Sequence, residues 1–137
     1  MKTVQLHDKH FKLKIPSDHI QAAIAAMASH MKKDIGDEVP LFLGVLNGCF
    51  RFVADLVSYY EAPCNVSFVK VASYEGTRST GEVKRLIGLD ENVAGRVVVV
   101  VEDIVDTGRT VEQILYDLEG RGAKRIIIAT LLFKPDA

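Results

Sequence analysis

The sequence lacks several features that would point to particular classes of protein. It has no tryptophan, only two cysteines (Cys49 and Cys64), and a net charge of −1 over 137 residues. With nothing to suggest the disulfide framework of a small secreted domain, we expect reduced thiols and a cytoplasmic protein. A charge so close to zero gives no broad basic surface, so neither nucleic acid nor an anionic membrane is an expected partner.

Long apolar runs are also missing. A helix that spans a bilayer needs about 20 apolar residues in succession, and no segment approaches this length. Residues 1–16 alternate polar and apolar side chains and contain no apolar core of signal-peptide length. No repeat, low-complexity tract or Pro/Gly-rich linker divides the chain. The length therefore predicts one domain over residues 1–137.

The chain does contain an alternation of helical and extended patterns. Amphipathic helices are expected over residues 17–33 and 50–60 and around 114–122, and apolar strands over residues 41–46, 65–74, 97–101 and 125–133. The strands are continuously apolar, which is typical of parallel strands with helices on both faces. The predicted fold class is therefore α/β, with an open, mostly parallel, twisted sheet flanked by helices.

Residues 74–92 interrupt this alternation. The segment is polar, contains glycines and is long for a connection inside a compact domain. Residues 83–89 are expected to form a hairpin strand, and the remainder a mobile loop. Loops of this length are often functional.

The stretch "VVVVVEDIVDTGRTVEQIL" places polar groups directly after the most apolar strand. Ligands of open parallel sheets bind beyond the carboxyl ends of the strands, where Glu102 and Asp103 are expected. The turn over residues 106–110 offers backbone N–H groups, hydroxyls and an arginine at a helix N-terminus, which suits a phosphate monoester. Because the upstream carboxylates would repel phosphate, we expect them to accept sugar hydroxyls or to hold Mg²⁺. The pattern predicts a site for a phosphorylated sugar.

A simpler interpretation treats these residues separately. Asp106 and Thr107 would cap a helix, and Glu102 and Asp103 would be a solvated strand end, since acidic residues are common at helix starts. Each residue alone fits this interpretation. Two acids, a spaced third acid and a Thr-Gly-x-Thr turn after one buried strand are more specific to a binding site.

The segment "VVVVEDIVDTGRT" resembles the phosphoribosyl diphosphate (PRPP) binding motif of type I phosphoribosyltransferases. The resemblance implies that the ribose hydroxyls meet Glu102 and Asp103, directly or through Mg²⁺. It also implies that Asp106 acts as the catalytic base toward nitrogen 7 of a purine. The 5′-phosphate would be bound by Asp106, Thr107, Gly108, Arg109 and Thr110.

Three further stretches resemble parts of the 6-oxopurine members of this family. "GVLNGCF" is similar to their pyrophosphate-binding turn, which often contains a non-proline cis peptide; Asn47 stands where many members carry lysine, and Gly48 follows it. "SYEGTRSTGEV" is similar to the flexible catalytic loop, with Ser73 and Tyr74 at its start. Lys134 matches the lysine that contacts the exocyclic oxygen of the base. In a simpler interpretation, the first stretch is an ordinary strand-to-helix turn, the second is a surface loop, and Lys134 is a solvent-facing lysine.

Together these resemblances imply transfer of the phosphoribosyl group from PRPP to hypoxanthine or guanine, with Mg²⁺ as cofactor and a dimeric or tetrameric assembly. Family members usually continue beyond the point that matches Ala137, so we expect part of the C-terminal hood over the base to be missing. The main alternative is a non-catalytic regulatory PRPP-binding protein of the same fold; such relatives bind RNA through a basic surface, which the charge does not support. Adenine, orotate and uracil enzymes share the PRPP motif, but Lys134 and "VLNG" favour 6-oxopurines. A phosphate-accepting signalling domain would not explain Thr-Gly-Arg-Thr.

Overall fold

The computed structural model describes residues 3–75, 82–105 and 108–134. In chain order the elements are β1 (Thr3–Leu6), β2 (Lys9–Lys12), α1 (Ser17–Ile35), β3 (Leu41–Val45), α2 (Phe50–Tyr60), β4 (Asn65–Glu75), β5 (Glu82–Ile87), β6 (Val97–Val105), α3 (Arg109–Gly120) and β7 (Arg125–Phe133). None of the helices in this part of the chain is both long and apolar enough to cross a membrane.

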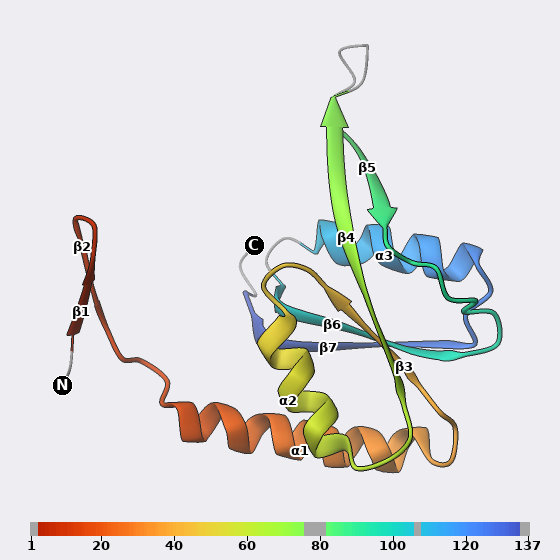
Figure 1. Cartoon of the computed structure of the whole chain (residues 1–137), viewed down its shortest axis with the longest axis horizontal. Helices are drawn as coiled ribbons and strands as arrows, with labels where there is room; N and C mark the ends of the chain where they lie inside the picture. The colour runs from red at the N-terminus through yellow and green to blue at the C-terminus, as the bar shows by residue number, and fades with distance from the viewer. Residues whose placement is uncertain (1–2, 76–81, 106–107, 135–137) are drawn as a thin grey trace.

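A five-stranded sheet with the order β5-β4-β3-β6-β7 forms the body of the protein (Figure 1). The strands β4, β3, β6 and β7 run parallel, and β5 pairs with β4 in the antiparallel direction. The predicted α/β class with an open, mostly parallel sheet is therefore confirmed. The central strand β3 is buried along its whole length.

The valine run of β6 contributes side chains to two hydrophobic cores, one on each face of the sheet. Because side chains alternate across a strand, the odd-numbered members of residues 97–101 pack on the side of α1 and α2. The even-numbered members pack on the other side, with Ile114 and Leu118 of α3. Figure 1 shows the same division, with α1 and α2 on one face of the sheet and α3 on the other. This explains why the run is continuously apolar.

The strand β6 is longer than the sequence predicted. We expected it to end at Val101, but it continues to Val105 because β7 still pairs with it through Val105 and Phe133. Glu102 and Asp103 therefore lie inside the last part of the strand, which fixes their backbone in the sheet.

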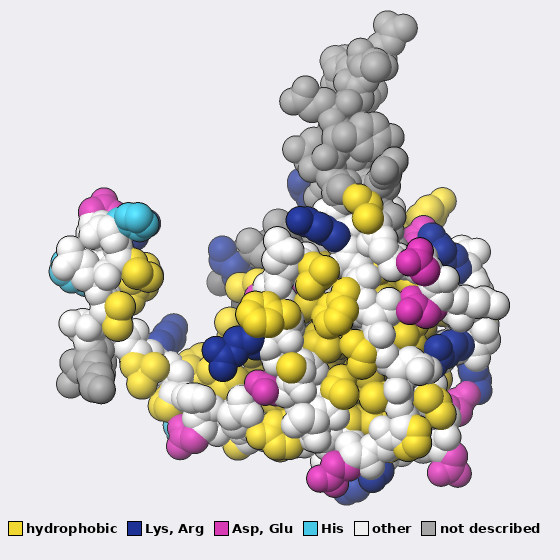
Figure 2. All heavy atoms as spheres, viewed as in Figure 1, with side chains coloured by type: hydrophobic (Ala, Val, Ile, Leu, Met, Phe, Trp, Pro, Cys, Tyr) yellow, Lys and Arg dark blue, Asp and Glu magenta, His cyan; other side chains and the backbone are white. Residues whose placement is uncertain are grey.

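An N-terminal hairpin of β1 and β2 was not predicted. Its two strands pair only over residues 3–12, and all their residues are exposed. Figures 1 and 2 show it apart from the body, joined to the start of α1. The alternating pattern of residues 1–16 carried the signal for these strands.

Gly44, in the middle of β3, provides a test of the packing beneath α2. A Cβ atom on Gly44 would lie 2.8 Å from both Phe68 Cδ1 and Val53 Cγ2, which is closer than side chains can pack. We expect Gly44→Ala to lower the free energy of unfolding by about 1–3 kcal/mol, as overpacked cores do. Urea denaturation measures this. Gly120→Ala is the control, because a Cβ there meets nothing within 4 Å; equal urea midpoints for the two variants would contradict the packing described.

Candidate active site

The turn between β3 and α2 contains the residues that resemble a pyrophosphate-binding turn. The peptide bond between Leu46 and Asn47 is cis, as the resemblance led us to expect. The N–H of Leu46 donates to the carbonyl of Val69 at 2.9 Å and so ties the start of the turn to β4. Asn47 and Gly48 are exposed, whereas the next residue, Cys49, is buried. The backbone of this turn is open to a ligand.

The carboxylate of Asp103 lies directly against this turn. A Cβ atom on Gly48 would be 2.5 Å from Asp103 Oδ2, so the glycine backbone and the carboxylate are in close contact. The other oxygen, Oδ1, accepts a hydrogen bond from the backbone N–H of Ile104 at 3.0 Å. The structure thus brings together two groups of predicted site residues that are far apart in the sequence.

The environment of Glu102 favours the protonated form of its carboxyl group. Burial, followed by the hydrogen bond and the negative charge of Asp103, raises the pKa of Glu102 to about 7. A carboxyl group in this position holds a proton near neutral pH unless a cation or a hydrogen-bond donor replaces it. The pair is therefore suited to bind a metal ion or sugar hydroxyls.

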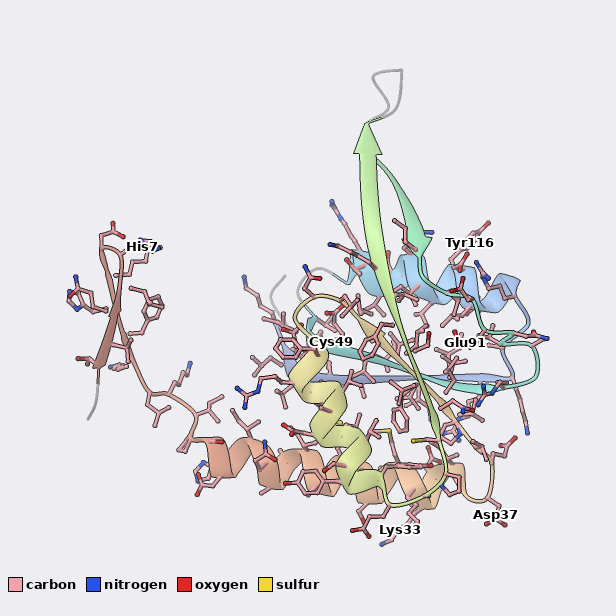
Figure 3. All side chains as sticks on the ribbon, viewed as in Figure 1. His7, Lys33, Asp37, Cys49, Glu91 and Tyr116 are labelled. Carbon is pink, nitrogen blue, oxygen red and sulfur yellow. The ribbon has the colours of Figure 1, made fainter. Side chains whose placement is uncertain are left out.

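Cys49 lies at the N-terminal end of α2, where Figure 3 labels it. Burial, followed by the charges of Glu102 and Asp103, raises the pKa of its thiol to about 11. The thiol is therefore neutral at physiological pH and is a poor nucleophile. Both Cys49 and Cys64 are free, which confirms the prediction of unpaired thiols. No local pattern in the sequence indicated that Cys49 would lie near the acidic pair.

The acidic pair fits Mg²⁺ that binds together with a phosphorylated substrate. In the described ranges, no group of three or more His, Cys, Asp or Glu side chains could hold a metal ion. Mg²⁺ usually needs only one or two carboxylates, because waters and substrate phosphates complete its octahedron. Glu102 and Asp103 can supply these carboxylates.

The turn into α3 follows the acidic pair along the chain. The helix begins at Arg109, after Gly108 with a φ of +82°, a left-handed conformation that favours glycine. Arg109 and Thr110 therefore lie in the first turn, where backbone N–H groups have no helical partners. Asp106 and Thr107, the other predicted members of the phosphate site, lie outside the described residues.

Lys134 lies at the same end of the sheet, just after the carboxyl end of β7. Its backbone N–H donates to the carbonyl of Val105 at 2.9 Å, so it lies beside the start of the phosphate turn. Ile104 and Leu132 are aligned across β6 and β7, and they are 46% and 47% exposed. This apolar surface beside a lysine was missed from the sequence, where Leu132 belonged to a predicted buried strand and Ile104 lay beyond the predicted strand end at Val101.

Ser73 and Tyr74, which match the start of the flexible catalytic loop, lie in β4, in agreement with the strand predicted over residues 65–74. They pair with Lys84 and Val83 of β5, so the hairpin continues past them. Residues 76–81, the centre of the predicted catalytic loop, lie outside the described part of the chain.

Comparison with known proteins identifies relatives of the whole body of the protein. Residues 16–137 match the sequence profile of the phosphoribosyl transferase domain. The hypoxanthine-guanine phosphoribosyltransferase of Streptococcus pyogenes (serotype M3) is 40% identical over 111 residues, which are 80% of this chain and 62% of that protein. The enzyme of the same name from Bacillus subtilis is 37% identical over 125 residues, 90% of this chain and 69% of the relative. The chain thus spans just under two thirds of the length of its streptococcal relative.

Comparison with solved structures also finds phosphoribosyltransferases. A hypoxanthine phosphoribosyltransferase from Staphylococcus aureus superposes with a TM-score of 0.81 at 26% identity, covering 91% of this chain and 69% of that one. A variant of the Trypanosoma cruzi enzyme, in complex with its product IMP, superposes with a TM-score of 0.80 at 26% identity. That match covers 97% of this chain and 73% of the other.

Proposed function

Because the chain belongs to the phosphoribosyl transferase family, we propose that it transfers the phosphoribosyl group of PRPP to hypoxanthine or guanine. The products would be IMP or GMP and pyrophosphate. The observation that carries this proposal is the contact of the Asn47–Gly48 turn with Asp103, on the strand that leads into the α3 turn. Sites for pyrophosphate, ribose and phosphate at one end of the sheet would match the three parts of PRPP.

PRPP would lie across the carboxyl ends of the parallel strands. Its 5′-phosphate would be held by residues 106–110, where hydroxyls, an arginine and the helix N-terminus offer donors. Its ribose hydroxyls would donate to Glu102 and Asp103, and the raised pKa of Glu102 favours a hydrogen-bond donor at that carboxyl group. Its pyrophosphate would accept hydrogen bonds from the backbone of Asn47 and Gly48. Bound Mg²⁺ would offset the charge that develops on the leaving pyrophosphate.

The base would be held beside Lys134. The ammonium group can donate to the 6-oxo group of hypoxanthine or guanine, whereas the amino group at that position in adenine offers no acceptor. The exposed surfaces of Ile104 and Leu132 suit the flat face of a purine. Asp106 would accept the proton of nitrogen 7, which makes nitrogen 9 a better nucleophile, and its charge would stabilise positive charge on the ribose.

The β4–β5 hairpin is the element that would exclude water. Ser73 and Tyr74 lie on it, close to residues 76–81 that resemble the catalytic loop. A ribose carrying positive charge would otherwise react with water, so closure over PRPP would protect the transfer.

Nucleotide formation tests the proposal directly. The chain should be assayed with PRPP and Mg²⁺, with hypoxanthine, guanine, adenine, orotate and uracil as separate acceptors. We expect IMP and GMP to form, and Lys134→Ala to raise the KM for hypoxanthine while the Kd of PRPP stays the same. Formation of AMP, orotidylate or UMP in their place would contradict the choice of base. PRPP binding without any turnover would favour the regulatory alternative.

We place this activity in the cytoplasm, because both cysteines are free thiols as in reducing compartments.

Assembly of the chain into a homodimer or tetramer is part of the same proposal. It is supported by β7, an edge strand of nine residues with apolar side chains that are only partly covered. Open edges of this kind are usually covered in native proteins.

A further inference from the structure

The contact between Gly48 and Asp103 assigns a second role to the glycine. We propose that Gly48 is a positioning residue: the absence of its side chain determines where the carboxylate of Asp103 stands, so that turn and strand end form one unit. The ligand part of this inference rests on the proposed function. The contact itself does not, and it can be tested without any ligand.

The space beside Gly48 is filled by one chemical group. The three heavy atoms nearest to a Cβ on Gly48 are Asp103 Oδ2, Cγ and Oδ1, at 2.5, 3.0 and 3.1 Å. All three belong to the same carboxylate. A methyl group at position 48 would therefore have to displace this carboxylate or move the turn.

The carboxylate of Asp103 is held on its other sides. Its Oδ1 accepts the hydrogen bond from the N–H of Ile104, and the carboxylate lies near enough to Glu102 to raise the pKa of that group. Pushing Oδ2 away from residue 48 would rotate the group, weaken this hydrogen bond and change the position of its charge relative to Glu102. A change at the turn would thus affect Glu102 through Asp103. None of the three atoms nearest to a Cβ on Gly48 belongs to Glu102 itself.

The alternation of β6 brings this carboxylate to the turn. Asp103 continues the odd-numbered series of residues 97–101, which faces α2. Gly48 lies two residues before the start of α2, and β3 pairs with β6 in parallel through Gly44 and Val101. The turn after β3 and the end of β6 therefore lie side by side on the same face of the sheet. Only a residue without a side chain at position 48 leaves room for the carboxylate.

A double-mutant cycle tests the contact in the free protein. Gly48→Ala is expected to lower the urea midpoint by about 0.5–1 M, the size expected of an overpacked contact. In an Asp103→Ala background the same change should have almost no effect, because all three clashing atoms are gone. In an Asp103→Asn background, which keeps the shape, it should remain as costly. Gly120→Ala, where a Cβ meets nothing within 4 Å, is the matched control.

Ligand binding tests the consequence for the site. By calorimetry, Gly48→Ala should raise the Kd of PRPP about tenfold, as misplaced metal and substrate carboxylates do, and should raise the Mg²⁺ concentration for half-saturation. Gly120→Ala should bind as the wild type does. An equal loss of stability in the Asp103→Ala and wild-type backgrounds would overturn the proposal, as would unchanged Mg²⁺ dependence in Gly48→Ala. If the wild type binds no PRPP, the proposed function fails, and the unfolding cycle still decides the contact.

Discussion

Replacing Asp106 with asparagine is expected to lower kcat for IMP formation by about 10²–10⁴-fold, the usual contribution of a general base. The amide keeps the size of the side chain but cannot accept the proton of nitrogen 7. It also removes the negative charge that would face the positively charged ribose in the transition state. The Kd of PRPP should change much less than kcat, because the backbone and the other members of residues 106–110 remain.

Steady-state kinetics with hypoxanthine as the varied substrate measures this effect. Asp117→Asn is a suitable control, because Asp117 lies on α3 and pairs with Arg121 in a surface ion pair. That variant should keep the wild-type kcat. If Asp106→Asn retained more than half of the wild-type kcat, the assignment of Asp106 as the base would be wrong.

Replacing Glu102 with glutamine is expected to change stability and binding in opposite directions. The pKa of Glu102 is raised from the ordinary value of 4.5 to about 7 in the folded protein. Between these values the folded state holds the proton more tightly than the unfolded state, so this group makes the protein less stable as pH rises from 4.5 to 7. Above pH 7 the loss is complete and constant. Glutamine cannot ionise and removes the loss.

At pH 8 without Mg²⁺, Glu102→Gln should therefore raise the free energy of unfolding by about 1–2 kcal/mol, allowing for the partial exposure of the group. At pH 4 the two proteins should be equally stable. The Kd of PRPP with Mg²⁺ should rise about 10–100-fold, because a carboxylate of the site is lost. Stabilising changes at sites that evolved for binding commonly have this cost to function.

Urea denaturation at pH 4, 6 and 8 and calorimetry with PRPP measure the two effects. Glu119→Gln, an exposed position near the end of α3, is the control for the loss of one charge. A stability difference that does not grow with pH would contradict the environment described for Glu102. Unchanged PRPP binding would remove Glu102 from the site.

The fold could be predicted closely because its signals are local. A valine run over residues 97–101 indicates burial on both faces. Ser17 was expected to cap the first helix, and α1 does begin there, although Pro16 takes the N-cap position and no side chain caps the helix. The end of β6 could not be predicted, since it depends on pairing with β7 as far as Phe133. The N-terminal hairpin was missed because its turn uses His7 at a φ of +57° and not the glycine that usually marks such turns.

The site could be predicted only as far as its chemistry is contiguous in the chain. The carboxylates and the phosphate turn of residues 102–110 form one string, so their residue types alone suggested a phosphorylated sugar. The contact of Gly48 with Asp103 depends on the register of β3 against β6, and the place of Lys134 depends on β6 against β7. The raised pKa of Glu102 depends on burial, which no local pattern reports.

The most direct test of the account is calorimetric titration of the wild-type chain with PRPP, first with Mg²⁺ and then with EDTA in its place. We expect saturable binding with Mg²⁺, a large loss of affinity with EDTA, and the same loss in Asp103→Ala when Mg²⁺ is present. These results would place PRPP and its metal ion at the junction of the Asn47–Gly48 turn and β6. Absence of binding by the wild type with Mg²⁺, or equally tight binding by Asp103→Ala, would contradict the account.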